Sequence, residues 1–209
     1  MNTVQKTLLA LVAGSLVSVS AQAALFSNTG YAAQPYAGVK IGQYSPDESG
    51  VDDAFSYGVY GGAKFTPNFG IEAEYLATND GNIDDDDVID DFDIPAGVTV
   101  DANTEYSASV LGLYGTYDYA FPNTALYAKG RLGVAKNKID VDSSVRVSNG
   151  DITETASGSE SISDTGIAGG LGLGYNFSPM ASVEAMYNFY PEVEDTKVSG
   201  ITIGAHYKF

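Results

Sequence analysis

The chain ends in GITIGAHYKF, residues 200–209, and this stretch decides how the rest of the sequence is read. Apolar residues take every second place, so that Ile201, Ile203 and Tyr207 fall on one face, while glycine, threonine, histidine and lysine fall on the other. A period of two is typical of a β-strand between two environments, because successive side chains point to opposite faces. The stretch therefore predicts a strand with one apolar face and one face of small and polar groups.

The same alternation recurs along the chain, and no stretch after residue 23 has the apolar spacing of a helix. The further predicted strands are 36–44, 55–65, 69–77, 107–119, 126–135, 167–177 and 182–190. With 200–209 they predict an all-β fold of eight antiparallel strands. In 107–119, Ser107 and Ser109 fall on the apolar side, so we expect a bulge there that restores the register.

The connections between these strands alternate in length. Three are short and each holds a proline, which fixes φ and cannot extend a ladder: 66–68, 120–124 and 178–180. Four are longer: 45–53, 78–104, 136–164 and 191–197. A transmembrane barrel has short turns at its periplasmic end and long loops at its outer end. We therefore predict an eight-stranded transmembrane up-and-down β-barrel with periplasmic termini and extracellular loops, of which 157–163 is a flexible tip.

The two faces separate this reading from a soluble barrel of lipocalin type, in which the apolar face would point inward around a ligand. Here the second face carries many charged residues and would make a poor lipophilic pocket. Eight strands enclose a space just wide enough for side chains, so we expect opposite charges to pair and plug the lumen rather than to line an ion pathway. The predicted lumen network is Lys40, Lys64, Glu72, Glu74, Lys129, Arg131 and Glu184.

Aromatic residues cluster where the predicted strands meet the short turns. Amphipathic rings prefer the headgroup level of a membrane, so these residues predict a periplasmic girdle. They are Tyr36, Phe65, Phe69, Tyr117, Tyr119, Phe121, Phe177, Tyr207 and Phe209.

The N-terminus predicts export. Residues 1–23 combine the positive Lys6, an apolar run shorter than the roughly 20 residues of a membrane helix, and a small-x-small site at Ala21–Ala23. We expect this signal peptide to be removed, leaving one domain at 24–209. Its removal takes away Lys6 alone among charged residues, so the formal net charge moves from −17 to −18, all of it carried by the four long connections. Such a charge argues against nucleic acid as a partner.

The absence of cysteine excludes a disulfide framework, thiolate zinc sites and a cysteine nucleophile. No catalytic residue and no cofactor are predicted. The single histidine, His206, falls on the inward face near the periplasmic end, far from the outer rim where lipid-modifying barrels carry a Ser or His site.

Three segments resemble those of a known family. Thr202, Gly204, Tyr207 and Phe209 match a polar-x-Gly-x-x-aromatic-x-aromatic pattern, and PYAGV at 35–39 and the glycine-rich 169–174 are similar in kind. From about Tyr31 to Phe209 the chain resembles the small outer-membrane β-barrels that include OmpX, the opacity proteins and the membrane domain of OmpA. The resemblance implies that those four residues form the signal read by the barrel-assembly machinery. The chain lacks the peptidoglycan-binding domain of full OmpA-type proteins, so an anchoring role does not carry over.

The most conspicuous loop is 79–101, with nine Asp and no Lys or Arg. Carboxylates are suitable ligands for Ca²⁺ or Mg²⁺, which makes Asp84, Asp85, Asp86 and Asp87 weak metal candidates, although the spacing fits no EF-hand. The bland alternative is a solvated loop that gathers divalent ions diffusely near lipopolysaccharide phosphates.

These features predict an outer-membrane protein with a structural or surface-interaction role, adhesin-like or in envelope integrity, exercised through its acidic loops. The expected partners are outer-membrane lipid and lipopolysaccharide, the barrel-assembly machinery, and host or environmental surface ligands. The alternative is a narrow porin-like channel for small solutes or lipophilic molecules, because Gly170, Gly172 and Gly174 would leave space on the inner face.

Overall fold

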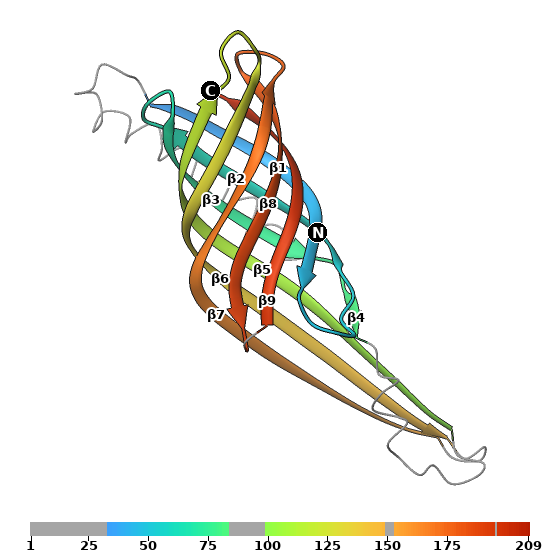
Figure 1. Cartoon of the computed structure of the whole chain (residues 1–209). Coiled ribbons are helices and arrows are strands. Elements are labelled where there is room, and N and C mark those ends of the chain that lie inside the picture. The colour runs from blue at the N-terminus through green and yellow to red at the C-terminus, as the bar shows by residue number, and fades with distance from the viewer. Residues whose placement is uncertain (1–32, 84–98, 149–152, 195) are drawn as a thin grey trace.

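The chain folds into antiparallel strands in this computed structural model, which describes residues 33–83, 99–148, 153–194 and 196–209 (Figure 1). The predicted signal peptide at 1–23 lies outside the described residues. The strands are β1 (Gln34–Pro46), β2 (Ala54–Lys64), β3 (Phe69–Thr78), β4 (Gly81–Ile83), β5 (Thr99–Ala120), β6 (Leu126–Ser148), β7 (Thr153–Asn176), β8 (Ala181–Val193) and β9 (Thr196–Lys208). None of the described residues belongs to a helix that is long and apolar enough to cross a membrane.

The sheet closes on itself. Its order is β3-β2-β1-β9-β8-β7-β6-β5-β4, and β3 also pairs directly with β5, so the eight long strands form a ring. The short β4 lies outside this ring and pairs with β5 at residues 104–106. Each predicted strand lies within an observed one or overruns it by a single residue, which confirms the eight-stranded antiparallel barrel. Closure pairs each of the eight long strands with a neighbour on both sides, which removes the free edges of an open sheet.

The outward face of the ring is apolar and exposed. Leu171, Val39 and Leu132 leave 73%, 62% and 62% of their surface uncovered. Their neighbours in sequence point inward and include the buried Lys40 and Arg131. So large an exposed apolar surface fits a protein that is surrounded by lipid.

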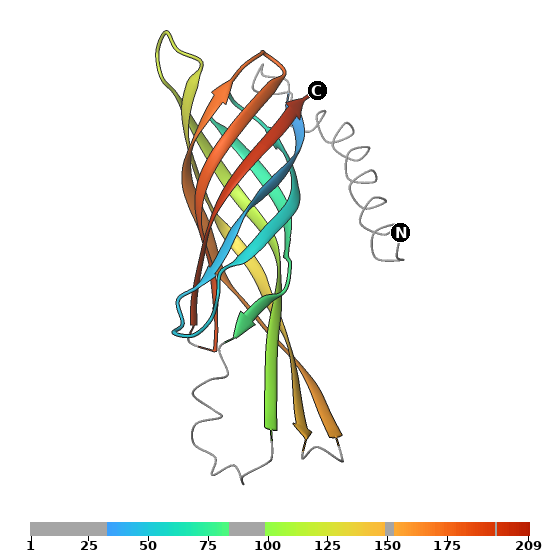
Figure 2. The ribbon, with the colours of Figure 1, turned by 90° about the vertical axis from the view of Figure 1, so that its right-hand side faces the viewer.

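The two ends of the barrel differ (Figure 2). The three short turns lie at one end, together with the C-terminus and the start of β1, where Phe209 N donates to Pro35 O at 2.9 Å. We call this the turn end and the opposite end the loop end. Backbone hydrogen bonds close the turns, as between Phe65 N and Phe69 O at 2.9 Å.

Exposed aromatic rings surround the turn end, but two of the nine predicted residues are not among them: Phe65 is half-buried and Tyr36 is buried. Tyr36 points into the lumen and is only 2% exposed, so its assignment to the girdle is wrong. Tyr36 lies four residues from Lys40 in β1, and because strand side chains alternate, the two point to the same face. Tyr175 is exposed at this end, and so are the other seven predicted residues: Phe69, Tyr117, Tyr119, Phe121, Phe177, Tyr207 and Phe209. Edge-to-face pairs join neighbouring members, as between Phe69 and Tyr117 at a centroid distance of 4.9 Å.

The described parts of the third long connection, 136–148 and 153–164, are strand rather than loop. β6 and β7 continue their ladder as far as Ser148 and Thr153, and β5 pairs with β6 back to Thr99. These extensions form a three-stranded ribbon that projects beyond the ring at the loop end (Figures 1 and 2). The period of two continues through Ile139 and Val141, which pack against the buried cluster. The predicted flexible tip at 157–163 is therefore wrong, since each of its residues pairs with β6.

The predicted bulge in β5 is also wrong. The register with β3 reaches Ser109, its last pair, without a shift, and the register with β6 runs past it to pair Ser107 with Asp140. Both serines lie on the outward face, near the boundary at which that face stops being apolar.

A pair of glycines tests the packing of the ring. An added Cβ at the inward Gly174 would lie 2.0 Å from Cζ of Tyr127, whereas one at the outward Gly130 would meet only Leu171 Cδ2 at 3.5 Å. We expect Gly174→Ala to lower the free energy of unfolding by about 1 to 3 kcal/mol, because the aromatic ring of Tyr127 must move. Gly130→Ala should lower it much less. Urea unfolding in lipid vesicles measures both; equal costs would contradict this packing.

Candidate functional site

The candidate site is the interior of the ring, where charged residues from four strands meet. Lys40 comes from β1, Glu72 and Glu74 from β3, Lys129 and Arg131 from β6, and Glu184 from β8. Each of these six residues is at most 5% exposed. They amount to three cations facing three carboxylates, which we call the lumen network. Buried charges of this kind persist only when they are paired and hydrogen-bonded.

Arg131 binds both carboxylates of β3. Its Nη1 lies 3.0 Å from Glu72 Oε1 and 2.8 Å from Glu74 Oε2, and its Nη2 lies 3.0 Å from Glu74 Oε1. Nη2 also donates to Asn188 Oδ1 at 2.7 Å. Lys40 pairs with Glu74 from the other side. The guanidinium is planar with several fixed donors, so it can hold two carboxylates at once.

Lys129 extends the network toward β8. Its Nζ lies 2.5 Å from Glu72 Oε2 and 2.9 Å from Glu184 Oε2. His206 Nδ1 lies 3.3 Å from Glu184 Oε1 and 3.1 Å from the Tyr60 hydroxyl. The single histidine is thus part of the lumen packing.

Tyrosine hydroxyls supply donors that the sequence analysis missed. Tyr36 donates to Glu72 at 2.9 Å, Tyr114 to Glu74 at 2.7 Å and Tyr127 to Glu184 at 2.8 Å. Each acidic residue of the network therefore accepts from at least one cation and one phenol. Each tyrosine is an even number of residues away from an inward residue of its own strand. This alternation was the signal that could have identified them as inward-facing.

The seventh predicted residue, Lys64, lies apart from the network. It pairs with Asp118 near the turn end, where both side chains keep some exposure. The structure thus brings together six of the seven predicted residues, and Lys64 forms a separate ion pair.

The inward glycines of β7 do not leave space, so the reason given for a channel is wrong. An added Cβ at Gly170 would meet Asn188 Oδ1 at 2.7 Å, and one at Gly172 would meet Met186 Sδ at 2.3 Å. At Gly174 the Tyr127 ring lies equally close. Side chains from β6 and β8 fill the volume that these glycines vacate.

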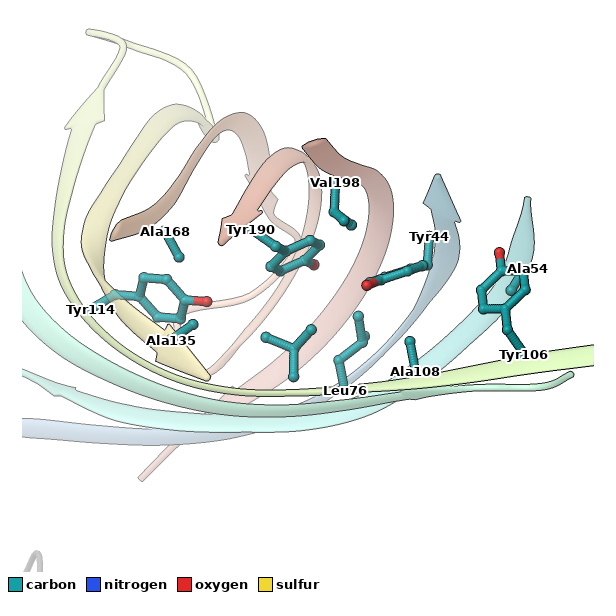
Figure 3. Close-up of a cluster of buried hydrophobic side chains, with 11 residues drawn as sticks. Tyr44, Ala54, Leu76, Tyr106, Ala108, Tyr114, Ala135, Ala168, Tyr190 and Val198 are labelled. Carbon is teal, nitrogen blue, oxygen red and sulfur yellow. The ribbon is translucent and has the colours of Figure 1, made fainter. Parts of the chain in front are cut away.

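The interior changes character toward the loop end, where it is apolar rather than polar (Figure 3). Tyr44, Val110 and Leu76 are at most 1% exposed there, and the rings of Tyr44 and Tyr190 stack at a centroid distance of 6.0 Å. This apolar layer lies between the lumen network and the loop end. It comprises Tyr44, Ala54, Leu76, Tyr106, Ala108, Val110, Tyr114, Ala135, Ala168, Tyr190 and Val198. We expected paired charges to plug the lumen; apolar residues at inward positions of β3 and β5 fill its loop-end part instead.

Of the four residues of the family's terminal pattern, Thr202, Gly204 and Tyr207 lie in β9, and Phe209 directly follows it. Thr202 points inward and accepts a hydrogen bond from Asn188 Nδ2 at 3.0 Å, and a Cβ at Gly204 would lie 3.0 Å from the Tyr60 hydroxyl. Tyr207 and Phe209 point outward and form an edge-to-face pair at 5.6 Å. Packing of the lumen therefore suffices to explain why threonine and glycine stand at positions 202 and 204. Recognition of the four residues by the assembly machinery stays a prediction.

The metal candidates Asp84, Asp85, Asp86 and Asp87 lie outside the described residues. Within the described part of the chain, no group of three or more His, Asp or Glu side chains is arranged to hold a metal ion.

Removing Arg131 tests how strongly the barrel depends on its network. We expect Arg131→Met to lower the free energy of unfolding by about 3 to 5 kcal/mol, because Glu72 and Glu74 lose a buried partner. The matched control Arg146→Met changes an exposed ribbon residue and should stay within about 0.5 kcal/mol. Adding Glu74→Gln to Arg131→Met should recover part of the loss. Urea titration in vesicles measures all three, and an Arg131→Met barrel of unchanged stability would refute the dependence.

Comparisons with known proteins agree with this architecture. At 18% identity, the chain is similar to Ail, the attachment invasion locus protein of Yersinia pestis, with 85% of this chain and 97% of that chain covered and a TM-score of 0.51. A major outer membrane protein of Thermus thermophilus aligns at 15% identity over 86% and 100%, also with a TM-score of 0.51. Neisserial surface protein A aligns at 15% identity over 85% and 97%, with a TM-score of 0.50. Identities this low support the fold alone.

No curated protein is close enough in sequence to be matched to this chain. The sequence model of one family, the outer membrane protein beta-barrel domain, matches residues 9–209. Proteins of this family lie in the outer membrane, and nearly the whole chain takes part in the match. The chain therefore belongs to the outer membrane protein beta-barrel family.

Proposed function

We propose that this protein is a self-filled, non-conducting barrel whose working surface is its loop end, facing the cell exterior. The observation that carries the proposal is the double filling of the lumen, by paired charges in one half and by an apolar layer in the other. Eight strands enclose little more than the volume of their own side chains. A barrel filled in this way would contact its partners through its outer surfaces and not through the lumen.

The loop end is acidic where it is described. Asp47, Glu48, Asp52 and Asp53 lie exposed in the β1–β2 connection, and Glu160 lies exposed on the ribbon. A surface of one sign attracts partners of the other and speeds their encounter. We therefore propose a partner with a basic surface, or divalent ions that bridge these carboxylates to lipopolysaccharide phosphates.

The comparison with Ail bears on the kind of ligand. One Ail structure contains sucrose octasulfate, a heparin analogue, which is a dense polyanion. The net charge of −17 makes such a ligand unfavourable here. We therefore propose a role in surface interaction, adhesive or in envelope integrity, with a ligand of the opposite charge.

The orientation and the assembly route are part of the same proposal. The short turns and both chain termini would lie in the periplasm, as in other outer-membrane barrels, which have short periplasmic turns and longer extracellular loops. Tyr207 and Phe209 expose their rings at that end, where the barrel-assembly machinery would read them.

Conductance measurement tests the filled lumen. We expect the purified protein to insert into planar bilayers without stable openings, because the network and the apolar layer leave no continuous water path. The variant Tyr44→Ala/Tyr190→Ala removes two large rings of the apolar layer, and the further change Arg131→Ala/Glu74→Ala thins the network; we expect openings only in the combined variant. Stable openings of the unaltered protein would favour the narrow channel instead.

Neutralising the acidic loop tests the surface role. Changing Asp84, Asp85, Asp86 and Asp87 to Asn removes four charges while keeping side-chain size. We expect weaker retention of protein-bearing vesicles on a polylysine surface at low salt, and loss of the difference at about 1 M salt, where the Debye length is about 3 Å. Gly130→Ala serves as a control that leaves the charge unchanged. Retention that depends on neither the charges nor the salt would contradict the proposal.

A further inference from the structure

The barrel wall loses its backbone ladder between β7 and β8 near the loop end. Gly169 and Phe189 form the final pair between these strands, although β8 runs on to Val193. β7 instead continues into the ribbon, paired with β6 alone (Figure 1). Pro191 lies in this unpaired part of β8, and its nitrogen has no hydrogen to donate to a ladder. Side chains must close the wall here.

The gap is closed on its lumen side. Asn137 Nδ2 donates to the Pro191 carbonyl oxygen at 3.1 Å, and the Tyr44 hydroxyl donates to Asn137 Oδ1 at 2.9 Å. Gly166 lets Pro191 approach β7, since a Cβ at that glycine would lie 3.3 Å from Pro191 Cβ. These side chains cover the gap on its lumen side, and what remains is a cleft that opens on the outer surface and reaches Tyr190 and Val198 of the apolar layer.

This cleft has a volume of about 780 Å³ and lies between β7, the β8–β9 hairpin and the end of β1. Ile167, Tyr187 and Phe189 line it and are 69%, 56% and 41% exposed, so its floor continues the apolar outward face. Tyr190 lines it as well and is also a member of the apolar layer. Volumes of 300 to 1,000 Å³ are typical of sites that hold small molecules.

The loop-side rim of the cleft is charged and mostly negative. Asp47, Asp164 and Glu192 line it together with one cation, Lys197. In the described parts of the chain, none of these four takes part in an ion pair. A site with an apolar floor and unpaired carboxylates at its rim suits a molecule with an alkyl chain and a cationic head.

We propose that the cleft between β7 and β8 binds a membrane amphiphile that carries a cationic, ammonium-type head group. Its alkyl chain lies along Ile167, Tyr187 and Phe189, and its head lies at Asp164 and Glu192. The molecule enters sideways from the leaflet that surrounds the loop end, because the floor of the cleft is continuous with the lipid-facing surface. This site goes beyond the role proposed for the acidic loops and does not depend on whether the lumen conducts.

The absence of tryptophan from the chain allows a direct test. Tyr187→Trp places a lone indole at the cleft, and Tyr175→Trp places one on the same outward face near the turn end, where Tyr175 is 46% exposed. The protein is purified from outer membranes into phosphatidylcholine vesicles and titrated with dodecylammonium brominated near its chain end. A brominated dodecyl sulfate is the comparison. Bromine quenches indole fluorescence only at short range.

We expect saturable quenching at the cleft indole, with a half-saturating concentration about fivefold lower for the ammonium than for the sulfate. The half-saturating concentration of the ammonium, divided by that of the sulfate, should be lower at the cleft indole than at the Tyr175→Trp indole. The Tyr175→Trp indole reports the bilayer alone. Adding Asp164→Asn/Glu192→Gln to Tyr187→Trp should remove this excess preference. Unlabelled dodecylammonium should compete, and butylammonium should not. Equal behaviour of the two indoles, or a preference that survives neutralisation, would overturn the proposal, and competition by butylammonium would overturn entry from the membrane.

Discussion

Every backbone N–H and C=O that faces lipid must find a partner within the protein, because the hydrocarbon interior offers none. The direct pairing of β3 with β5 meets this requirement by closing the ring. Closure at eight long strands then fixes the width of the interior, and that width dictates what can fill it. The lumen network, the tyrosines that donate to it and the glycines of β7 are one solution to filling a narrow space without leaving an unpaired charge. The apolar layer completes the filling from the loop side.

The architecture was predictable from the sequence because it depends on a local period. Alternation fixed which residues share a face, and this was enough to group Lys40 with Glu74 and Arg131 before any contact was known. Short, proline-bearing turns fixed the order of the strands and their common end. These features depend on neighbours in the chain, which is where sequence patterns carry most information.

The remainder depended on pairing across the sheet. Residues 153–165 have the composition of a loop, and they form a strand because β6 offers a partner edge along their whole length. Tyr36 was assigned by its position near a turn, although its parity placed it beside Glu72. The cleft could not be foreseen, since it exists where the register of β7 with β8 stops and the chain itself continues. Composition describes a segment, and pairing decides its structure.

The ribbon extends far beyond the ring of strands. A strand advances about 3.3 Å per residue, so the part of β6 beyond Asn137 spans at most roughly 35 to 40 Å. The polar zone on one side of a bilayer is only about 5 to 8 Å thick. Three paired strands also bend far less than a single chain of the same length. The ribbon is thus a stiff arm that reaches several times farther than the headgroups, and a large object could touch its tip while staying clear of the membrane surface.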